Sequence, residues 1–358
     1  MLRLVGLAQA SKYYRANAQA IGQNNFSNNG NEIAWGTIGN ASSSEGHFFE
    51  AINAAGVLQI PMIVSVWDDA FGISVPAKYQ TTKENISEIL KGFQRDEKNH
   101  GYEIYTVKGW DYVSLCSAYE KAANISRQEH VPCLIHVTEL TQPQGHSTSG
   151  SHERYKSKER LDWETEYDCN LQFKKWILEN GIATNEELNT IDNEAQIHVN
   201  VSKKAAWEAY LTPIKNDVSV VCDLLNDLAN ALQLSEITHI KNELQNINEP
   251  IRKDIAIAIN QSLRLSYKNQ CMERERLISY KNQFLKINEE RFNSHLHSQS
   301  KENALLVNEI APVYTNESNL VDGREIMVAC FDHLLSTDPR VLAFGEDLGN
   351  IGDVNQGF

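Results

Sequence analysis

Short apolar runs alternate with amphipathic stretches over the first 140 residues of the chain. Four of the runs have the length and continuity of strands, at 33–38, 62–66, 103–107 and 133–137. Between them, 45–57 and 111–127 carry apolar residues at helical spacing. Strands that alternate with helices predict βαβ units and a mostly parallel sheet. The runs at 62–66 and 133–137 are largely apolar, which is typical of strands buried on both faces.

The second half of the chain has a different pattern, in which one helix is expected to follow another from Trp163 to His297. The apolar face of one of these helices is marked by Val220, Val221, Leu224, Leu225, Leu228 and Leu232. The stretch 295–318 has few periodic signals and is typical of a linker. After it we expect a helix over 322–335 and a strand over 341–344. The buried positions expected in that helix are Ile326, Val328, Phe331, Leu334 and Leu335.

Composition narrows the class of protein. A chain of 358 residues predicts two to three domains. Its 33 basic and 47 acidic residues give a net charge of −14, which argues against a nucleic-acid partner because that affinity comes from Lys and Arg. No apolar run is long enough for a membrane span, and the N-terminus turns polar too soon for a signal peptide. The six cysteines show no CxxC spacing, so we expect reduced thiols in a cytoplasmic protein.

The segment 36–76 carries the clearest signs of chemistry. Small residues and then a helix start follow the strand that ends at Gly39, and such a turn forms an anion site because free backbone N–H groups point at the ligand. The next strand ends at Asp68 and Asp69, so we expect Asn40 and Asp69 to lie side by side at the carboxyl ends of two strands. Amide and carboxylate oxygens suit Mg²⁺ with bound phosphate. These residues leave one alternative open, an ordinary βαβ unit with an acidic surface loop.

This segment resembles the thiamine-diphosphate motif in the α-subunit of 2-oxo acid dehydrogenase E1 components. The matching stretches keep their order and spacing over about 40 residues: Gly39–Gly46, Glu50–Asn53, Pro61, Asp68–Asp69, Phe71–Ser74 and Pro76. The Ser-Glu-Gly and Gly-Ile-Ser-x-Pro versions are closer to the branched-chain type than to the pyruvate type. The resemblance implies thiamine diphosphate and Mg²⁺ as cofactors, with Asn40, Asp69 and the Phe71 carbonyl as metal ligands. The cofactor contacts that it implies are Gly39, Asn40, Ala41, Ser42, Asp69, Phe71, Ile73 and His146.

The motif departs from the family pattern at three positions. The metal-binding Asp of the family is Asn40 here, and the metal-binding Asn is Asp69. One carboxylate and one amide remain, so the charge that faces Mg²⁺ is unchanged. The second glycine of the family's G-D-G is Ala41, and a methyl group there can crowd the diphosphate.

Residues 139–160 form a long stretch rich in Ser, Gly, Thr and His, without apolar periodicity. A loop of this length in a compact domain is usually functional or mobile. Gly145–Ser149 resembles the G-H-S-x-S of the E1 α-subunit loop near the cofactor. The resemblance implies that His146 is a catalytic residue in contact with the cofactor, and that Ser147 corresponds to a serine phosphorylated in mitochondrial members. A solvated loop histidine is the alternative for His146.

The last segment, 322–358, resembles the start of the E1 β-subunit, on the strength of Asp338–Val341 and Gly345–Asp347. The resemblance implies a single-chain fusion of α-like and β-like parts, with Glu346 near the cofactor as a second catalytic residue. A solvated carboxylate is the alternative for Glu346. In the family, residues before the position of Met1 and an I-S-E-type motif beyond Phe358 also contribute to the site. We therefore expect the chain to behave as a fragment that is inactive or nearly so in isolation.

Together these observations predict an α/β thiamine-diphosphate-binding fold, a parallel sheet flanked by helices, followed by a helical connector and the start of a second α/β domain. The expected divisions are 1–160 for the α-like cofactor domain, 161–212 for its helical end, 213–318 for the connector and 319–358 for the β-like start. The implied activity is oxidative decarboxylation of a 2-oxo acid, with acyl transfer to the lipoyl group of a partner E2 acyltransferase. We expect a homodimer or larger assembly, no nucleic acid and no membrane.

Two other functions stay open at this point. One is a transketolase-like or other thiamine-diphosphate enzyme, against which the His146 loop and the helical connector argue. The other is a truncated, inactive copy that serves as a subunit-interaction module, which Asn40 and Ala41 keep possible. The sequence does not specify the 2-oxo acid.

Overall fold

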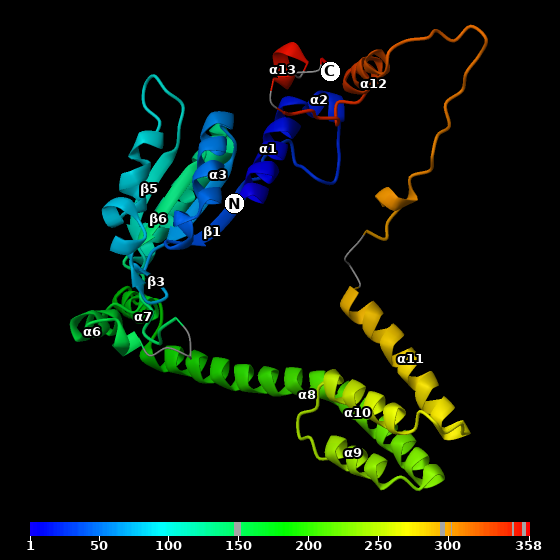
Figure 1. Ribbon diagram of the computed structural model, residues 1–358. Coiled ribbons are helices and arrows are strands. Elements are labelled where there is room, and N and C mark those ends of the chain that lie inside the picture. Colours follow the sequence, from blue (N-terminus) through cyan, green and yellow to red (C-terminus); the bar gives the residue numbers. More distant parts are fainter. Residues whose placement is uncertain (147–151, 294–297, 302, 346, 353–355) are drawn as a thin grey trace. The chain divides into compact units, whose positions relative to one another are not determined.

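The computed structural model describes residues 1–146, 152–293, 298–301, 303–345, 347–352 and 356–358 (Figure 1). The chain forms two compact units, one made of 1–185 with 319–358 and the other of 186–318. Two residues singled out above, Ser147 and Glu346, lie outside the described residues. The four-part division expected from the sequence stays a prediction, although one long helix runs through the boundary between 212 and 213.

A four-stranded parallel sheet organises the first unit, as the alternating pattern predicted. Its strands are β1 (Ala34–Gly39), β2 (Met62–Trp67), β5 (Glu103–Lys108) and β6 (Cys133–Thr138). They follow the order β1-β2-β6-β5. In the register, Gly39 lies opposite Trp67, which in turn lies opposite Val137. The carboxyl ends of β1, β2 and β6 therefore meet at one edge, so the residues that follow them are brought together.

Helices complete the hydrophobic core on both faces of the sheet. These are α1 (Leu2–Ala16), α3 (Gly46–Leu58) and α5 (Tyr112–Glu129). Alternate residues of β2 point to opposite faces: Met62, Val64 and Val66 pack with Phe48 and Ile52 of α3, and Ile63 packs with Ala118 and Ala122 of α5. Burial of β2 on both faces confirms the expectation from its apolar sequence. The helix α1 was not expected, and its Ala8 is buried against the sheet.

Shorter elements complete the first unit. A two-stranded hairpin, β3 (Phe71–Gly72) with β4 (Val75–Pro76), follows β2 directly. The loop after β6 leads through a turn of 3₁₀ helix, His152–Arg154, into α6 (Lys158–Glu166) and α7 (Cys169–Glu179). The remaining short helices of this unit are α2 (Ala18–Ile21), α4 (Ile86–Ile89) and α13 (Leu348–Ile351), and the 3₁₀ turns Ser42–Ser44, Ala77–Tyr79, Thr82–Glu84 and Leu90–Phe93.

The second unit is helical. It contains α8 (Asn185–Leu232), α9 (Ser235–Gln245), α10 (Arg252–Leu265), α11 (Met272–Asn293) and a 3₁₀ turn at Ala304–Leu306. Its core gathers apolar residues of all four α-helices, among them Leu225, Ile237, Ile255 and Leu277. The amphipathic face expected on α8 is confirmed in part: Val221, Leu225 and Leu228 are buried, whereas Val220 is exposed.

Two expectations for the C-terminal segment are wrong. A helix does form, α12 (Gly323–Thr337), but Ile326, Leu334 and Leu335 are exposed rather than buried. Residues 341–344 are not a strand. A strand is held by hydrogen bonds to a neighbour, and no strand pairs with 341–344 within the described part of the chain. The second α/β domain is therefore not seen among these residues.

Two further features bear on the sequence-based expectations. No helix within the described ranges is both long and apolar enough to cross a lipid bilayer. All six cysteines are free thiols.

Candidate functional site

A cavity of about 800 Å³ lies at the carboxyl edge of the sheet, where β1 and β2 end. Every described residue that was expected to contact the cofactor lines it: Gly39, Asn40, Ala41, Ser42, Asp69, Phe71, Ile73 and His146. Trp67, Gln80 and Cys169 also line the cavity and were not expected. The fold thus brings together segments that are separated by more than 100 residues, although the roles of these residues stay predictions.

Asn40 supplies an unpaired polar group to this cavity. Its backbone N–H donates to the Trp67 carbonyl at 3.0 Å, which ties the end of β1 to the end of β2. The residue is only 5% exposed, and its side-chain Nδ2 atom has no hydrogen-bond partner in the described structure. Gln80 Oε1 is also buried without a described partner. A buried polar atom left unpaired costs about 1–3 kcal/mol, so a polar ligand that bonds to these groups would recover that cost.

The turn after β1 offers backbone donors to the same cavity. The N–H groups of Ala41 and Ser42 have no acceptor among the described residues, whereas those of Ser43, Ser44 and Glu45 bond back within the turn. Free N–H groups at such a turn suit an anion, and the anion site expected from the sequence stays a prediction. Ala41 has φ −64° and ψ −40°, a conformation open to any residue, so the position does not require the glycine of the family motif.

The Ala41 methyl also has a defined place. A Cβ atom added to Gly72 would lie 2.7 Å from the Ala41 Cβ and 2.2 Å from Gln80 Nε2. Gly72 therefore has to be glycine for β3 to approach the turn this closely. The methyl of Ala41 packs toward β3, and the crowding of a diphosphate by this methyl stays a prediction.

Asp69 provides a partly desolvated carboxylate to the cavity that Asn40 also lines. Burial raises the pKa of Asp69 above its ordinary value, and the Phe71 N–H with the charges of Lys156 and Arg160 partly offsets the rise. Its Oδ1 accepts the Phe71 N–H at 3.0 Å, and the Oδ1 of Asp68 accepts the Ala70 N–H at 2.7 Å. A carboxylate that has lost water gains more from a cation than one in solvent, because the local dielectric constant is lower.

The donors around this point fit a magnesium ion that carries a phosphate group. The described residues contain no group of three or more His, Cys, Asp or Glu side chains that could hold a metal. A cation here would instead use the Asn40 amide, the Asp69 carboxylate and the Phe71 carbonyl, an all-oxygen set typical of Mg²⁺, which keeps several waters and phosphate oxygens. The unpaired Nδ2 group of Asn40 and the free N–H groups of Ala41 and Ser42 can donate hydrogen bonds to the phosphate oxygens.

Two residues after β2 have strained backbones. Ala70 has φ +70° and Ile73 has φ +58°, a region that is rare for alanine and costly for a β-branched residue. Ile73 is also 59% exposed, although it lines the cavity. Strain of this kind persists where surrounding structure enforces it, and it clusters at ligand sites.

His146 lines the cavity from the loop after β6. Gly145 has φ +74°, and a Cβ atom there would lie 2.7 Å from His152 Nδ1, so the loop passes close to the 3₁₀ turn that follows it. The neighbouring Ser147 falls outside the described residues, and so does Glu346. Both therefore stay predictions.

A buried histidine near the site was missed from the sequence. His136 of β6 is fully buried, with Nε2 2.9 Å from Asp68 Oδ2 and Nδ1 3.0 Å from Ser87 Oγ. It fixes the start of the Asp68–Phe71 turn to the central part of the sheet. A signal for it exists, because a lone histidine within the apolar run 133–137 has to find polar partners when the strand is buried.

The chain belongs to the family described as "Dehydrogenase E1 component", whose sequence pattern it matches over residues 2–214. It is 28% identical over 181 residues to the 2-oxoisovalerate dehydrogenase subunit alpha of Bacillus subtilis (strain 168), which covers 50% of this chain and 52% of that protein. It is 27% identical over 186 residues to 2-oxoisovalerate dehydrogenase subunit alpha 1, mitochondrial, of Arabidopsis thaliana. That alignment covers 51% of this chain and 38% of the relative. It is 22% identical over 212 residues to the pyruvate dehydrogenase E1 component subunit alpha of Rickettsia bellii (strain RML369-C). That alignment covers 59% of this chain and 57% of the relative.

The chain therefore spans about half the length, or less, of these curated relatives. The matched region, 2–214, includes the whole parallel sheet and the cavity at its carboxyl edge. Membership of the family agrees with the resemblance found in the motif between Gly39 and Pro76.

Proposed function

We propose that the cavity at the ends of β1 and β2 binds thiamine diphosphate with Mg²⁺, and that the chain takes part in oxidative decarboxylation of a 2-oxo acid. One observation carries the proposal: the eight expected cofactor contacts line a single cavity that presents an unpaired amide, free backbone N–H groups and a desolvated carboxylate. The names of the relatives support the same class of reaction.

Each residue has a part in this proposal. Asn40, Asp69 and the Phe71 carbonyl would hold Mg²⁺, and the Ala41 and Ser42 N–H groups would bind diphosphate oxygens. Ile73 would present its apolar side chain to the organic part of the cofactor. When bound, thiamine diphosphate supplies the electron sink that decarboxylation of a 2-oxo acid requires, while the protein supplies position and electrostatics.

His146 would act on the substrate side of the cavity. An imidazole ring can donate a hydrogen bond from one nitrogen and accept one at the other, which suits contact with the carboxylate or ketone of a 2-oxo acid. The branched-chain type is favoured by the Ser-Glu-Gly and Gly-Ile-Ser-x-Pro versions of the motif. The acyl group would pass to the lipoyl group of a partner E2 acyltransferase, and the working form would be a homodimer or larger.

The test is calorimetric titration of the whole chain with thiamine diphosphate, with and without Mg²⁺. Wild type is expected to bind only with the metal, and Asp69→Ala to lose about 100-fold or more in affinity because it removes the one charged ligand. The control is Asp162→Ala, on the exposed side of α6, which should bind like wild type. Absence of metal-dependent binding by wild type would contradict the proposal and favour the subunit-interaction module.

A further inference from the structure

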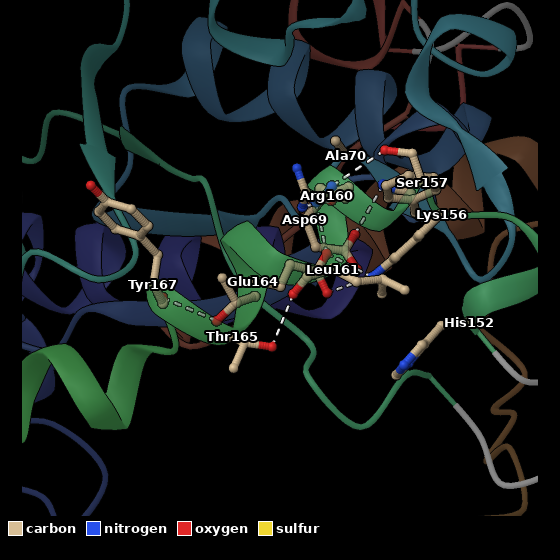
Figure 2. A network of polar contacts seen from close by, with 12 residues as sticks. Asp69, Ala70, His152, Lys156, Ser157, Arg160, Leu161, Glu164, Thr165 and Tyr167 are labelled. Atoms are coloured by element: carbon tan, nitrogen blue, oxygen red, sulfur yellow. Dashed lines mark hydrogen bonds and ion pairs between the residues drawn. The ribbon is translucent and has the colours of Figure 1, made fainter.

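A cluster of charged side chains is buried next to the Asp69 turn, outside the residues singled out from the sequence (Figure 2). Lys156 and Glu164 have side chains that are 1% and 0% exposed. The Lys156 Nζ atom donates to both oxygens of Glu164, at 2.7 and 3.0 Å. Arg160 Nε donates to Glu164 Oε1 at 2.8 Å. Arg160 and Glu164 are four residues apart in α6, so they share one face of that helix.

A buried cluster of charges contributes little net stability to a fold. Removing charges from water costs several kcal/mol per ion, and apolar residues of similar volume often serve a core as well or better. Two cations surround one carboxylate here, so the cluster has one positive charge to spare. The contacts that it makes beyond its own members therefore deserve an explanation other than stability.

Those contacts converge on the turn that carries the proposed metal ligands. Arg160 Nη2 donates to the backbone carbonyl of Asp69 at 2.9 Å, across 91 residues of sequence. The Lys156 Nζ and Arg160 Cζ atoms lie 5.1 and 5.6 Å from the centre of the Phe71 ring, within the range of cation–π attraction. Tyr155 packs against the same ring, with centroids 5.8 Å apart.

Arg160 bonds to the carbonyl of Asp69 and not to its carboxylate. No ion pair reaches that carboxylate from any residue the structure describes. The arginine thus fixes the backbone of the turn while the carboxylate stays available for a metal ion. A lysine or arginine paired with the carboxylate itself would compete with Mg²⁺ instead.

The backbone of the Asp69–Phe71 turn requires stabilisation by neighbouring residues. It contains Ala70 at φ +70° and leads into a hairpin whose strands are only two residues long. A divalent ion requires its ligands in nearly fixed positions, because Mg²⁺ demands close to ideal octahedral geometry. A turn free to relax from its strained conformation would move Asp69 and the Phe71 carbonyl together.

We propose that Arg160, oriented by Glu164 and Lys156, is a positioning residue that holds the Asp69–Phe71 turn in the conformation that binds the metal-bound cofactor. The proposal deepens the function given above and rests on it for the identity of the ligand. The hold on the turn itself is a property of the cofactor-free chain and can be measured without any ligand.

The experiment compares wild type, Arg160→Met, Arg160→Lys and the matched control Lys158→Met, an exposed position of the same helix. Hydrogen exchange of the cofactor-free chain is followed in peptides that cover 68–76 and, for comparison, the strands β2 and β6. Arg160→Met should exchange about tenfold faster in 68–76 alone, which is the loss expected for one hydrogen bond from a charged donor. Calorimetry should show a similar loss of Mg²⁺–thiamine diphosphate affinity, with Arg160→Lys in between and Lys158→Met unchanged.

The outcomes separate this inference from the proposed function. Faster exchange over β2 and β6 as well as 68–76 would show that Arg160 merely supports the fold, and the inference would be wrong. Equal cofactor affinity of wild type and Arg160→Met would also overturn it, while the proposed function would stand. If wild type binds no cofactor, the proposed function fails and the positioning role fails with it, even if exchange in 68–76 changes as expected.

Discussion

The sheet-containing part of the chain and the helical unit bury different kinds of side chain. Near the carboxyl edge of the sheet, the side chains of Asn40, His136, Lys156 and Glu164 are buried. In the described part of 186–318, the buried polar side chains are serines 262 and 266 alone. Each buried polar group costs free energy unless it is fully bonded, so a fold built only for stability uses few of them. The contrast is consistent with the ligand site proposed at this edge of the sheet.

The largest expected effect comes from breaking the charged cluster. Glu164→Gln keeps the shape of the side chain but leaves Lys156 and Arg160 without their carboxylate. We expect the free energy of unfolding of the sheet-containing part to fall by about 3–5 kcal/mol, because a buried charge loses its partner. Denaturant unfolding would measure it, with the exposed neighbour Glu166→Gln as control, within about 0.5 kcal/mol of wild type. Equal stability of the two variants would refute the prediction.

The matching change in the helical unit removes apolar volume. Leu225 is fully buried in the core of that unit. Leu225→Ala should destabilise the unit by about 2–5 kcal/mol, through lost burial and the cavity left behind, while cofactor affinity stays at the wild-type value. Unfolding curves and calorimetry check the two parts of the prediction, with the exposed Val220→Ala as control. A weaker cofactor affinity in Leu225→Ala alone would show that the two regions are not energetically separate.

A glycine should have opposite effects in the two regions. Ala70 has φ +70°, which glycine adopts without strain, so Ala70→Gly should raise the free energy of unfolding by about 1 kcal/mol. Ala205 lies on the exposed surface of α8, and Ala205→Gly should lower it by about 1 kcal/mol. Thermal unfolding measures both. If Ala70→Gly is also destabilising, the strain inferred for the turn is not there.

The smallest effect is a pH dependence confined to the sheet-containing part. His130 ends α5 with φ 56°, its Nε2 lies 3.1 Å from the Gly30 carbonyl oxygen, and burial lowers its pKa. The neutral form is therefore favoured in the folded state. Its contribution to stability is fully present above the unfolded pKa of about 6.5 and is lost as pH falls from there through the lowered folded pKa. His130→Asn, which suits the same backbone conformation, should reduce the loss of stability between about pH 7.5 and about pH 5. If the free energy of unfolding of His130→Asn depends on pH as that of wild type does, the role assigned to His130 is wrong.

Much of the fold could be predicted because local pattern and burial agree. The run 133–137 became β6 (Cys133–Thr138), and the stretch 45–57 became α3 (Gly46–Leu58). The strand expected at 341–344 failed for a non-local reason, since a strand exists only where another strand pairs with it. The helix α1 was missed because its amphipathic character is weak and its packing on the sheet selects it.

The candidate site also has features that the sequence predicts and features that only the fold reveals. Its backbone frame followed from the order of elements, because the residues after β1 and β2 have to meet at one edge of a parallel sheet. Arg160 could not have been found by this reasoning, because nothing in its local sequence refers to a carbonyl 91 residues earlier. The signal for His136 was present, but only the fold shows that its partner is Asp68.

The sequence by itself determined the alternation of strands and helices, and hence that Asn40 and Asp69 would lie at neighbouring strand ends with the small residues after Gly39. Only the tertiary structure decided that α6 returns to that edge and that Arg160 holds the turn by its backbone. The physical reason is that periodicity records which face of an element is buried, whereas the direction in which a later helix packs depends on contacts distributed over the whole domain.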